Sequence, residues 1–207
     1  MSVIIAIEGV DGVGKTTLCQ HLESYLGKKN CVTVSSPSKI LPIGKLLRKE
    51  FHDPEGRFSS LSGSGKLLLE DYLHKSAILE NCFYIHSLLS YPFIFLDRWI
   101  YSFYTYSRTL EFDYTKSDFF DNTPFSGLSN VPVIYINPPS KRVLQERMEN
   151  RSNPTKDDLD FDKAFQRHDK FLRVLNYLVP EDYIRISSPF TQKEMGDIIS
   201  FIRSNKS

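Results

Sequence analysis

The sequence of 207 residues has few cysteines, almost no net charge and no long apolar run. Its cysteines, Cys19, Cys31 and Cys82, are too widely spaced for a zinc motif and too few for a disulfide framework. A net charge of +1 predicts no broad electrostatic surface for a nucleic acid polymer or an acidic membrane. Apolar runs such as residues 93–96 fall far short of the ~20 residues of a membrane span, and no basic segment precedes the first one. We therefore expect a cytoplasmic protein with reduced thiols.

The remaining composition is that of a globular protein, with 41% hydrophobic and 25% charged residues. A length a little above ~150 residues predicts a single domain over residues 1–207. Short apolar runs typical of buried strands cover residues 3–7, 32–34, 93–96, 133–136 and 183–186. Segments of helical period cover residues 18–26, 43–51, 66–89, 100–110, 140–148, 160–178 and 191–202. This alternation predicts a three-layer α/β/α fold, with a five-stranded parallel sheet and helices on both faces.

A phosphate-binding motif follows the first predicted strand directly. Residues 9–16, GVDGVGKT, match G-x-x-x-x-G-K-[ST] in full. The glycines let the backbone curl with its amides pointing inward, and the next helix begins with unpaired N–H groups, so both attract anions. Lys15 is expected to reach the β- and γ-phosphates of ATP, and the Thr16 hydroxyl to bind Mg²⁺. The residues expected to bind ATP are Gly12, Val13, Gly14, Lys15, Thr16 and Thr17. The motif predicts a P-loop NTPase fold.

Asp97 and Arg98 follow the predicted strand at residues 93–96. Ligands of parallel α/β sheets bind at the carboxyl ends of the strands, where this pair and the phosphate loop meet. A carboxylate there suits Mg²⁺ or the reacting phosphates, and a guanidinium matches a phosphate bidentately. We therefore predict that Thr16 and Asp97 hold the metal and that Lys15, Asp97 and Arg98 are catalytic. A local ion pair at the end of a strand is the alternative.

At these motifs the sequence resembles the thymidylate kinases. Residues 5–17 resemble the phosphate loop of that family, and residues 97–106 resemble its D-R-[YH]-x-x-S-x-x-A-[YF] segment. Residues 43–47 resemble the I-G-K-L-L stretch of its eukaryotic and viral members, and residues 133–151 its last core strand and lid entry. The resemblance implies a kinase that moves the γ-phosphate of Mg·ATP to dTMP. It also implies a homodimer and a short lid at about residues 149–158.

The same resemblance implies roles for residues around the acceptor nucleotide. Asp11 would face the 3′-hydroxyl, Arg98 would hold the phosphate, and Asp97 would lie at the reacting phosphates or the metal. Tyr106 would lie against the deoxyribose, where its ring disfavours a 2′-hydroxyl, and Ser102 would line the same pocket.

The chain also departs from the family pattern. Gly12 and Val13 stand where some relatives carry an arginine, so we expect the catalytic arginines to come from the lid. Arg147 and Arg151 are spaced i, i+4, so one helical face can present both of them, although a solvated basic face is the alternative.

On the acceptor side, relatives have an arginine just after the second strand, whereas residues 35–38 here read Ser-Ser-Pro-Ser. Only Pro37 of that segment is retained. Tyr72, His74 and Lys75 are the candidates for contact with the base, and we count Pro37 and Tyr72 among the expected substrate-binding residues.

Three alternative functions stay open at this point. A monophosphate kinase of different or broader base specificity fits the same motifs. A deoxynucleoside kinase needs a general base, commonly a carboxylate after the second strand, and residues 35–38 supply none. A non-catalytic nucleotide-binding protein has little need of an acceptor-side arginine. The expected partners are small-molecule nucleotides in each case.

Overall fold

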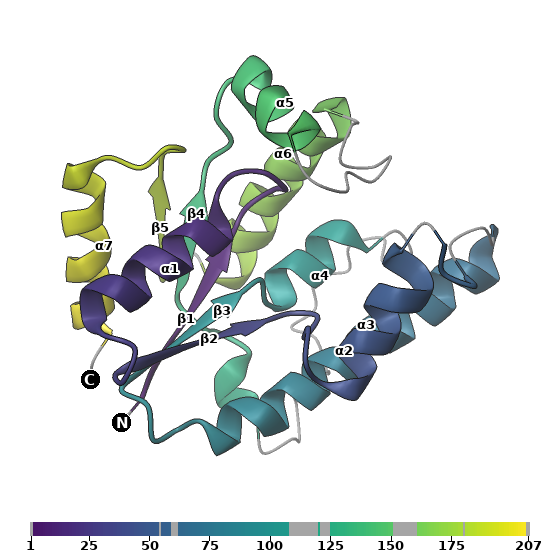
Figure 1. Cartoon of the computed structure of the whole chain (residues 1–207), viewed down its shortest axis with the longest axis horizontal. Helices are drawn as coiled ribbons and strands as arrows, with labels where there is room; N and C mark the ends of the chain where they lie inside the picture. The colour runs from purple at the N-terminus through teal and green to yellow at the C-terminus, as the bar shows by residue number, and fades with distance from the viewer. Residues whose placement is uncertain are drawn as a thin grey trace.

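The computed structural model describes residues 2–53, 55–58, 62–107, 120, 125–150, 161–179 and 181–205. Figure 1 shows their arrangement around a twisted sheet. The strands are β1 (Val3–Glu8), β2 (Cys31–Ser35), β3 (Phe93–Asp97), β4 (Val133–Ile136) and β5 (Tyr183–Ile186). The α-helices are α1 (Lys15–Leu26), α2 (Pro42–Leu47), α3 (Ser64–Ser87), α4 (Ile100–Tyr106), α5 (Lys141–Glu149), α6 (Phe161–Leu178) and α7 (Gln192–Ser204). A π-helix, η1 (Arg48–His52), follows α2, and a short 3₁₀ helix, η2 (Ser126–Leu128), precedes β4.

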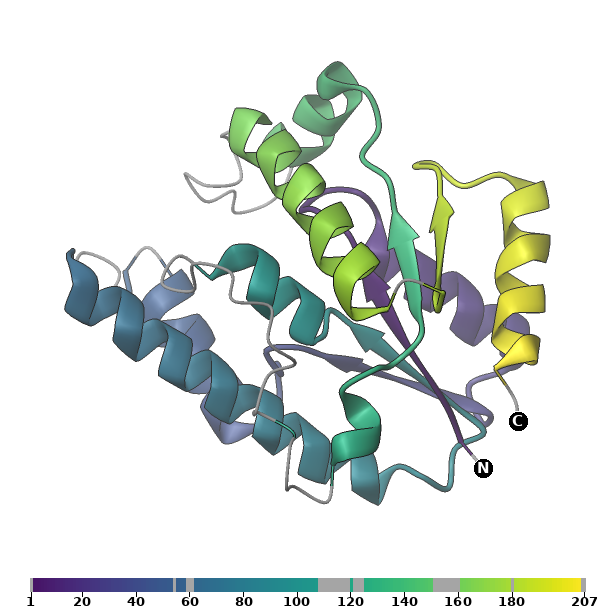
Figure 2. The same cartoon turned by 180° about the vertical axis from the view of Figure 1, so that it is seen from behind.

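All five strands are parallel, in the order β2-β3-β1-β4-β5. Helix α1 lies in front of the sheet in Figure 1, and α6 lies in front of it in the opposite view of Figure 2, so helices cover both faces. The predicted three-layer fold and its parallel sheet are thus confirmed. The register pairs Ile7 of β1 with Asp97 of β3, and Ser35 of β2 with the same Asp97. The carboxyl ends of these three strands therefore meet at one edge.

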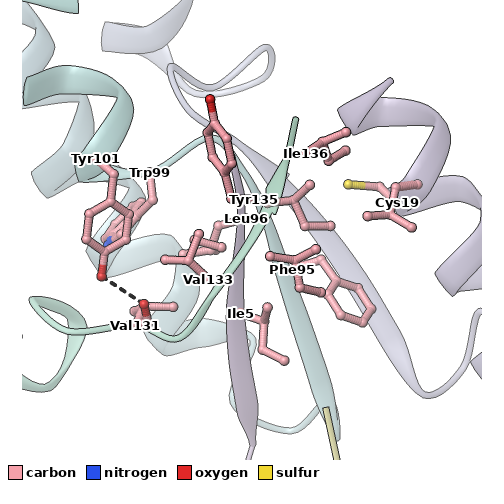
Figure 3. Packing of buried hydrophobic residues seen from close by; sticks show 14 of the residues in the cluster. Ile5, Cys19, Phe95, Leu96, Trp99, Tyr101, Val131, Val133, Tyr135 and Ile136 are labelled. Carbon is pink, nitrogen blue, oxygen red and sulfur yellow. Dashed lines mark hydrogen bonds between the residues drawn. The ribbon is translucent and has the colours of Figure 1, made fainter. Parts of the chain in front are cut away.

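The apolar runs form strands because they are buried from both sides. Ile5 of β1, Leu96 of β3 and Ile136 of β4 are fully buried. Figure 3 shows these side chains on neighbouring strands within the buried cluster, with Cys19 on the helix beside Ile136. Burying one such side chain stabilises the fold by about 1.5–3 kcal/mol. The packed sheet is therefore a rigid base for the loops at its edge.

Two predicted helices end earlier than expected. The segment predicted as one helix over 43–51 is α2 followed by the π-helix η1. The Glu50 carboxylate of η1 accepts a hydrogen bond from Arg57 Nε at 2.8 Å, and its carbonyl accepts one from Phe58 N. These contacts hold the wider turn, which apolar periodicity does not distinguish from an α-helical one. Helix α4 ends at Tyr106, and residues 108–110 of its predicted continuation lie outside the described part of the chain.

None of the described helices is both long enough and apolar enough to cross a membrane. The three cysteines are all unpaired and buried. Most of the predicted lid, residues 151–158, lies outside the described residues, so the lid stays a prediction.

Candidate active site

The phosphate loop joins β1 to α1 and depends on glycines at three positions. Gly9, Gly12 and Gly14 have φ angles of 146°, 79° and 102°, which side chains disfavour. A Cβ on Gly12 would also lie 2.6 Å from Met148 Sδ, because α5 packs over the loop. Figure 1 shows the loop running beneath α5 before α1 begins at Lys15. The loop thus presents the amino end of α1 as an anion site.

Lys15 lies deep in this loop, with 7% of its surface exposed. Its Nζ donates hydrogen bonds to the carbonyls of Gly9 at 3.0 Å and Val10 at 2.8 Å. Burial, and then the positive charge of Arg98, lowers the pKa of Lys15 to about 8. The negative charge of a bound polyphosphate would raise the pKa of Lys15 again, so the site favours an anionic ligand.

Arg98 reaches the same carbonyl from the neighbouring strand end. Its Nη1 lies 3.4 Å from the Gly9 oxygen that also accepts from Lys15 Nζ. Its Nη2 donates to Asp11 Oδ1 at 2.6 Å. Burial acts to lower the pKa of Arg98, but Asp11 and other neighbours outweigh it, so the pKa lies above its ordinary value. The two cations therefore flank one backbone atom, the carbonyl oxygen of Gly9.

Arg98 takes this position through an unusual backbone conformation. Its φ angle is 72°, in the left-handed region that costs a non-glycine residue about 1–3 kcal/mol. Its amide donates to the Ile7 carbonyl of β1 at 3.1 Å. This turn between β3 and α4 directs the guanidinium toward the phosphate loop.

Glu8 holds the turn in place. Its side chain is fully buried and accepts hydrogen bonds from Trp99 N at 2.7 Å and Ser102 Oγ at 2.6 Å. Burial raises the pKa of Glu8 to about 7, although those hydrogen bonds and the charges of Arg98 and Lys15 oppose the rise. We did not predict this residue as functional. The sequence contained one signal for Glu8, which is an acidic residue at the end of an apolar strand that is buried on both faces.

Asp11, Ser102 and Tyr106 lie around the Arg98 guanidinium. Tyr106 OH donates to Asp11 Oδ2 at 2.8 Å, and Arg98 Nη1 donates to Ser102 Oγ at 3.0 Å. The Tyr106 ring centroid lies 5.0 Å from the Arg98 guanidinium carbon and 4.8 Å from that of Arg167 on α6. The structure thus brings four predicted acceptor residues together. Arg167 was missed, because nothing in the sequence distinguishes it from other charged residues of its helix.

Thr16 and Asp97 also meet. Thr16 Oγ1 donates to Asp97 Oδ2 at 2.8 Å, so the hydroxyl at the start of α1 adjoins the carboxylate at the end of β3. Hard oxygen ligands of this kind suit Mg²⁺, which usually keeps several waters and takes further ligands from the substrate phosphates. In the described part of the chain no cluster of three metal-ligating side chains exists. A magnesium ion that takes its other ligands from water and nucleotide phosphates needs no such cluster.

Arg147 lies against the phosphate loop. Its Nη1 donates to Ser188 Oγ at 2.6 Å and lies 3.4 Å from the Gly12 carbonyl, while Ser188 Oγ donates to the Val13 carbonyl at 2.6 Å. Ser188 follows β5 and was not predicted, since no motif marks it. Arg151 lies outside the described residues.

Pro37 and Tyr72, the other two predicted substrate-binding residues, lie in different segments. Pro37 lies two residues after the end of β2, and its carbonyl accepts two hydrogen bonds from Arg48, at 3.1 Å and 2.6 Å. Tyr72 is 60% exposed on α3 and lies beneath Lys75 Nζ, so its contact with the base stays a prediction. The neighbouring His74 instead has its ring 6.2 Å from that of Phe103 on α4.

The parallel sheet, the glycine loop and the paired strand ends define a P-loop NTPase. The family model described as Thymidylate kinase matches residues 7–179, which is most of the chain. The protein therefore belongs to the thymidylate kinase family.

One curated relative and one solved structure are similar to this chain. A "Probable thymidylate kinase" from Methanosphaera stadtmanae is 29% identical over 113 residues, which are 47% of this chain and 57% of the relative. The matched segment thus spans little more than half of that protein. The structure of thymidylate kinase from Candida albicans has a TM-score of 0.65 and 19% identity over 100% of this chain and 94% of that one. At this identity the likeness supports the fold.

Proposed function

We propose that the protein transfers the γ-phosphate of Mg·ATP to the 5′-phosphate of dTMP, giving dTDP and ADP. One observation carries the proposal: Lys15 Nζ and Arg98 Nη1 both lie within hydrogen-bond reach of the Gly9 carbonyl. A cation for the donor phosphates and a cation for the acceptor phosphate are thus near neighbours. Transfer of this kind depends on positioning and charge neutralisation rather than on covalent chemistry, and this arrangement supplies both.

On the acceptor side, Arg98 is proposed to exchange part of its contact with Asp11 for the incoming phosphate. Asp11 then faces the sugar 3′-hydroxyl, and the Tyr106 ring lies against the deoxyribose beside Ser102. The hydrogen bond from Tyr106 OH to Asp11 supports these roles, because it fixes both groups relative to Arg98.

On the donor side, the loop from Gly12 to Thr17 is proposed to bind the phosphates of ATP, with Lys15 at the β- and γ-phosphates. Thr16 and Asp97 are proposed to hold Mg²⁺, which when bound neutralises charge on the reacting phosphates. Their 2.8 Å contact supports this pairing.

Arg147 and Arg151 are proposed to contribute positive charge from the entry to the lid. The contacts of Arg147 with Gly12 and Ser188 support a role for it on the donor side. Closure of the lid would exclude water from the reacting phosphates.

We also propose a homodimer that acts in the cytoplasm, where ATP and nucleoside monophosphates are available. Large apolar side chains are exposed on α2 and α3, among them Leu46, Leu68 and Phe83, and they support a surface for a second copy. The free, buried cysteines fit a reducing compartment. Light scattering on the purified protein tests the dimer by its mass.

The function is tested by ADP release from Mg·ATP with each of a panel of acceptors. We expect dTMP to stimulate ADP release strongly, thymidine not to do so, and other deoxynucleoside monophosphates to act more weakly. Stimulation by thymidine alone would show a nucleoside kinase. No stimulation by any acceptor would show a nucleotide-binding protein without this activity.

A further inference from the structure

The side chain of Tyr106 contacts groups from three other segments of the chain. Its hydroxyl donates to Asp11 Oδ2 of the phosphate loop at 2.8 Å, and the guanidinium carbon of Arg98 lies 5.0 Å from its ring centroid. From α6, the guanidinium carbon of Arg167 lies 4.8 Å from the same centroid. Both cations are within the distance of about 6 Å at which a cation attracts an aromatic ring. Asp11 and Arg98 already have proposed roles at the acceptor, whereas Arg167 has none.

Helix α6 holds the end of α4 along one of its faces. Arg167 and Phe171 are spaced i, i+4 and so lie on the same face, and the Phe171 ring meets that of Tyr106 edge-on, with 6.0 Å between the centroids. Lys170 Nζ donates to the carbonyl of Ser107, the residue after α4, at 3.0 Å. Figure 2 shows the two helices side by side. The position of the Tyr106 ring therefore depends on α6 as well as on its own helix.

This part of α6 is anchored on the sheet. Phe171 is fully buried, and its ring centroid lies 5.6 Å from that of Tyr135 on β4. The Tyr135 hydroxyl lies 2.7 Å from Nδ1 of His168, the residue next to Arg167. The backbone that carries Arg167 is therefore fixed relative to the sheet, and so is the base of its side chain.

The contacts of Tyr106 hold different parts of its side chain. Burial raises the pKa of Tyr106, while the charges of Arg98 and Arg167 act to lower it, and the phenol stays neutral. A neutral hydroxyl can donate, and the bond to Asp11 fixes that end of the side chain. The two guanidinium groups act on the ring itself, because the attraction is to its π-electrons. Without them the ring could tilt about its bond to Asp11.

We propose that Arg167 is a positioning residue that holds the Tyr106 ring against the deoxyribose and thereby sets the preference for deoxyribose over ribose. This inference rests on the proposed function, since it concerns the sugar of the same acceptor. When the acceptor phosphate binds Arg98, that guanidinium turns toward the phosphate, and Arg167 is the cation that stays on the ring. An apolar wall rejects an added hydroxyl only modestly, so the preference depends on a wall that does not move.

The test compares dTMP with its ribose analogue, ribothymidine 5′-monophosphate. Arg167→Met removes the cation and keeps much of the length of the side chain. Arg173→Met is the matched control, because Arg173 is an exposed arginine of the same helix. Arg167→Met is also made in Tyr106→Leu, which has no ring. The measurement is kcat/KM for each acceptor, and discrimination is the value for dTMP divided by the value for the ribose analogue.

We expect Arg167→Met to lower discrimination roughly 3- to 30-fold, as the loss of one cation–π contact predicts. The value of kcat/KM for the ribose analogue should rise, while that for dTMP should change less than about threefold, because the smaller sugar needs no movement of the ring. Arg173→Met should match wild type. In Tyr106→Leu the same change at residue 167 should alter discrimination less than about twofold, because no ring remains to be held. If Arg167→Met does not fold, as judged by circular dichroism, Arg167→Gln carries the same test.

Equal losses for the two acceptors, or the same fall in discrimination without the ring, would show that Arg167 only supports the fold of the site. Unchanged discrimination in Arg167→Met would show that it does not hold the ring. In each of these cases the wild-type protein still phosphorylates dTMP, so the proposed function survives. Wild-type protein that does not use dTMP would overturn both the function and this inference.

Discussion

The buried carboxyl group of Glu8 predicts a stability that depends on pH in a specific window. The pKa of Glu8 is raised from 4.5 to about 7 because the side chain is fully buried at the end of β1. A pKa that is higher in the folded state means that the folded protein binds the proton more tightly. The stability this group contributes is therefore fully present below pH 4.5 and is lost as the pH rises through 7.

Replacing Glu8 by glutamine tests this directly. The glutamine carbonyl can still accept from Trp99 N, and its amide can donate to Ser102 Oγ, but it stays neutral at every pH. The change of pKa from 4.5 to about 7 corresponds to about 3 kcal/mol. Below pH 4.5 the difference in unfolding free energy between the variant and the wild type should not change with pH. Between pH 4.5 and 7 the difference in unfolding free energy should shift by about 3 kcal/mol in favour of the variant.

Urea denaturation of both proteins at several pH values from about 4 to about 7 measures that shift. Parallel curves of unfolding free energy against pH would show that Glu8 titrates normally, and the argument from its burial would be wrong. The variant should also lose activity, because the neutral amide of the glutamine attracts Arg98 and Lys15 less strongly than a carboxylate does.

Three further predictions concern the reacting groups. Lys15→Ala should lower kcat by several orders of magnitude with an unchanged circular dichroism spectrum, and near-normal turnover would refute its role. Asp97→Asn should raise the Mg²⁺ concentration for half-maximal activity roughly tenfold, and an unaltered titration would remove Asp97 from the metal site. Tyr106→Phe keeps the ring but loses the 2.8 Å bond to Asp11, so KM for dTMP should rise roughly 5- to 20-fold while discrimination against a 2′-hydroxyl persists. A variant that accepts dTMP and its ribose analogue equally would contradict the role of the ring.

The sequence predicted the fold and the centre of the site because both depend on local signals. Buried parallel strands appear as short apolar runs, and a phosphate loop needs glycine and lysine at fixed spacing. The ends of parallel strands meet at one edge, so Lys15 and Arg98 could be expected near each other before the structure was known.

The residues that were missed depend on contacts between distant segments. Arg167 reaches Tyr106 only because α6 packs against α4, and Ser188 contacts Val13 across 175 residues of sequence. The sequence did not decide among Tyr72, His74 and Lys75, because a shift of two residues along α3 turns a side chain to another face, and the structure places His74 on the face toward α4. The periodicity of apolar residues does not determine which side chains of α3 face α4.

We propose that one site holds the donor and acceptor phosphates end to end. The most direct test is inhibition by a compound in which adenosine and thymidine are joined through their 5′-oxygens by five phosphates. If Lys15 and Arg98 bind the two ends of one pentaphosphate chain, the compound should compete with both ATP and dTMP. It should also bind at least about 100-fold more tightly than either. Competition with ATP alone, at an affinity no better than that of ATP, would contradict the account.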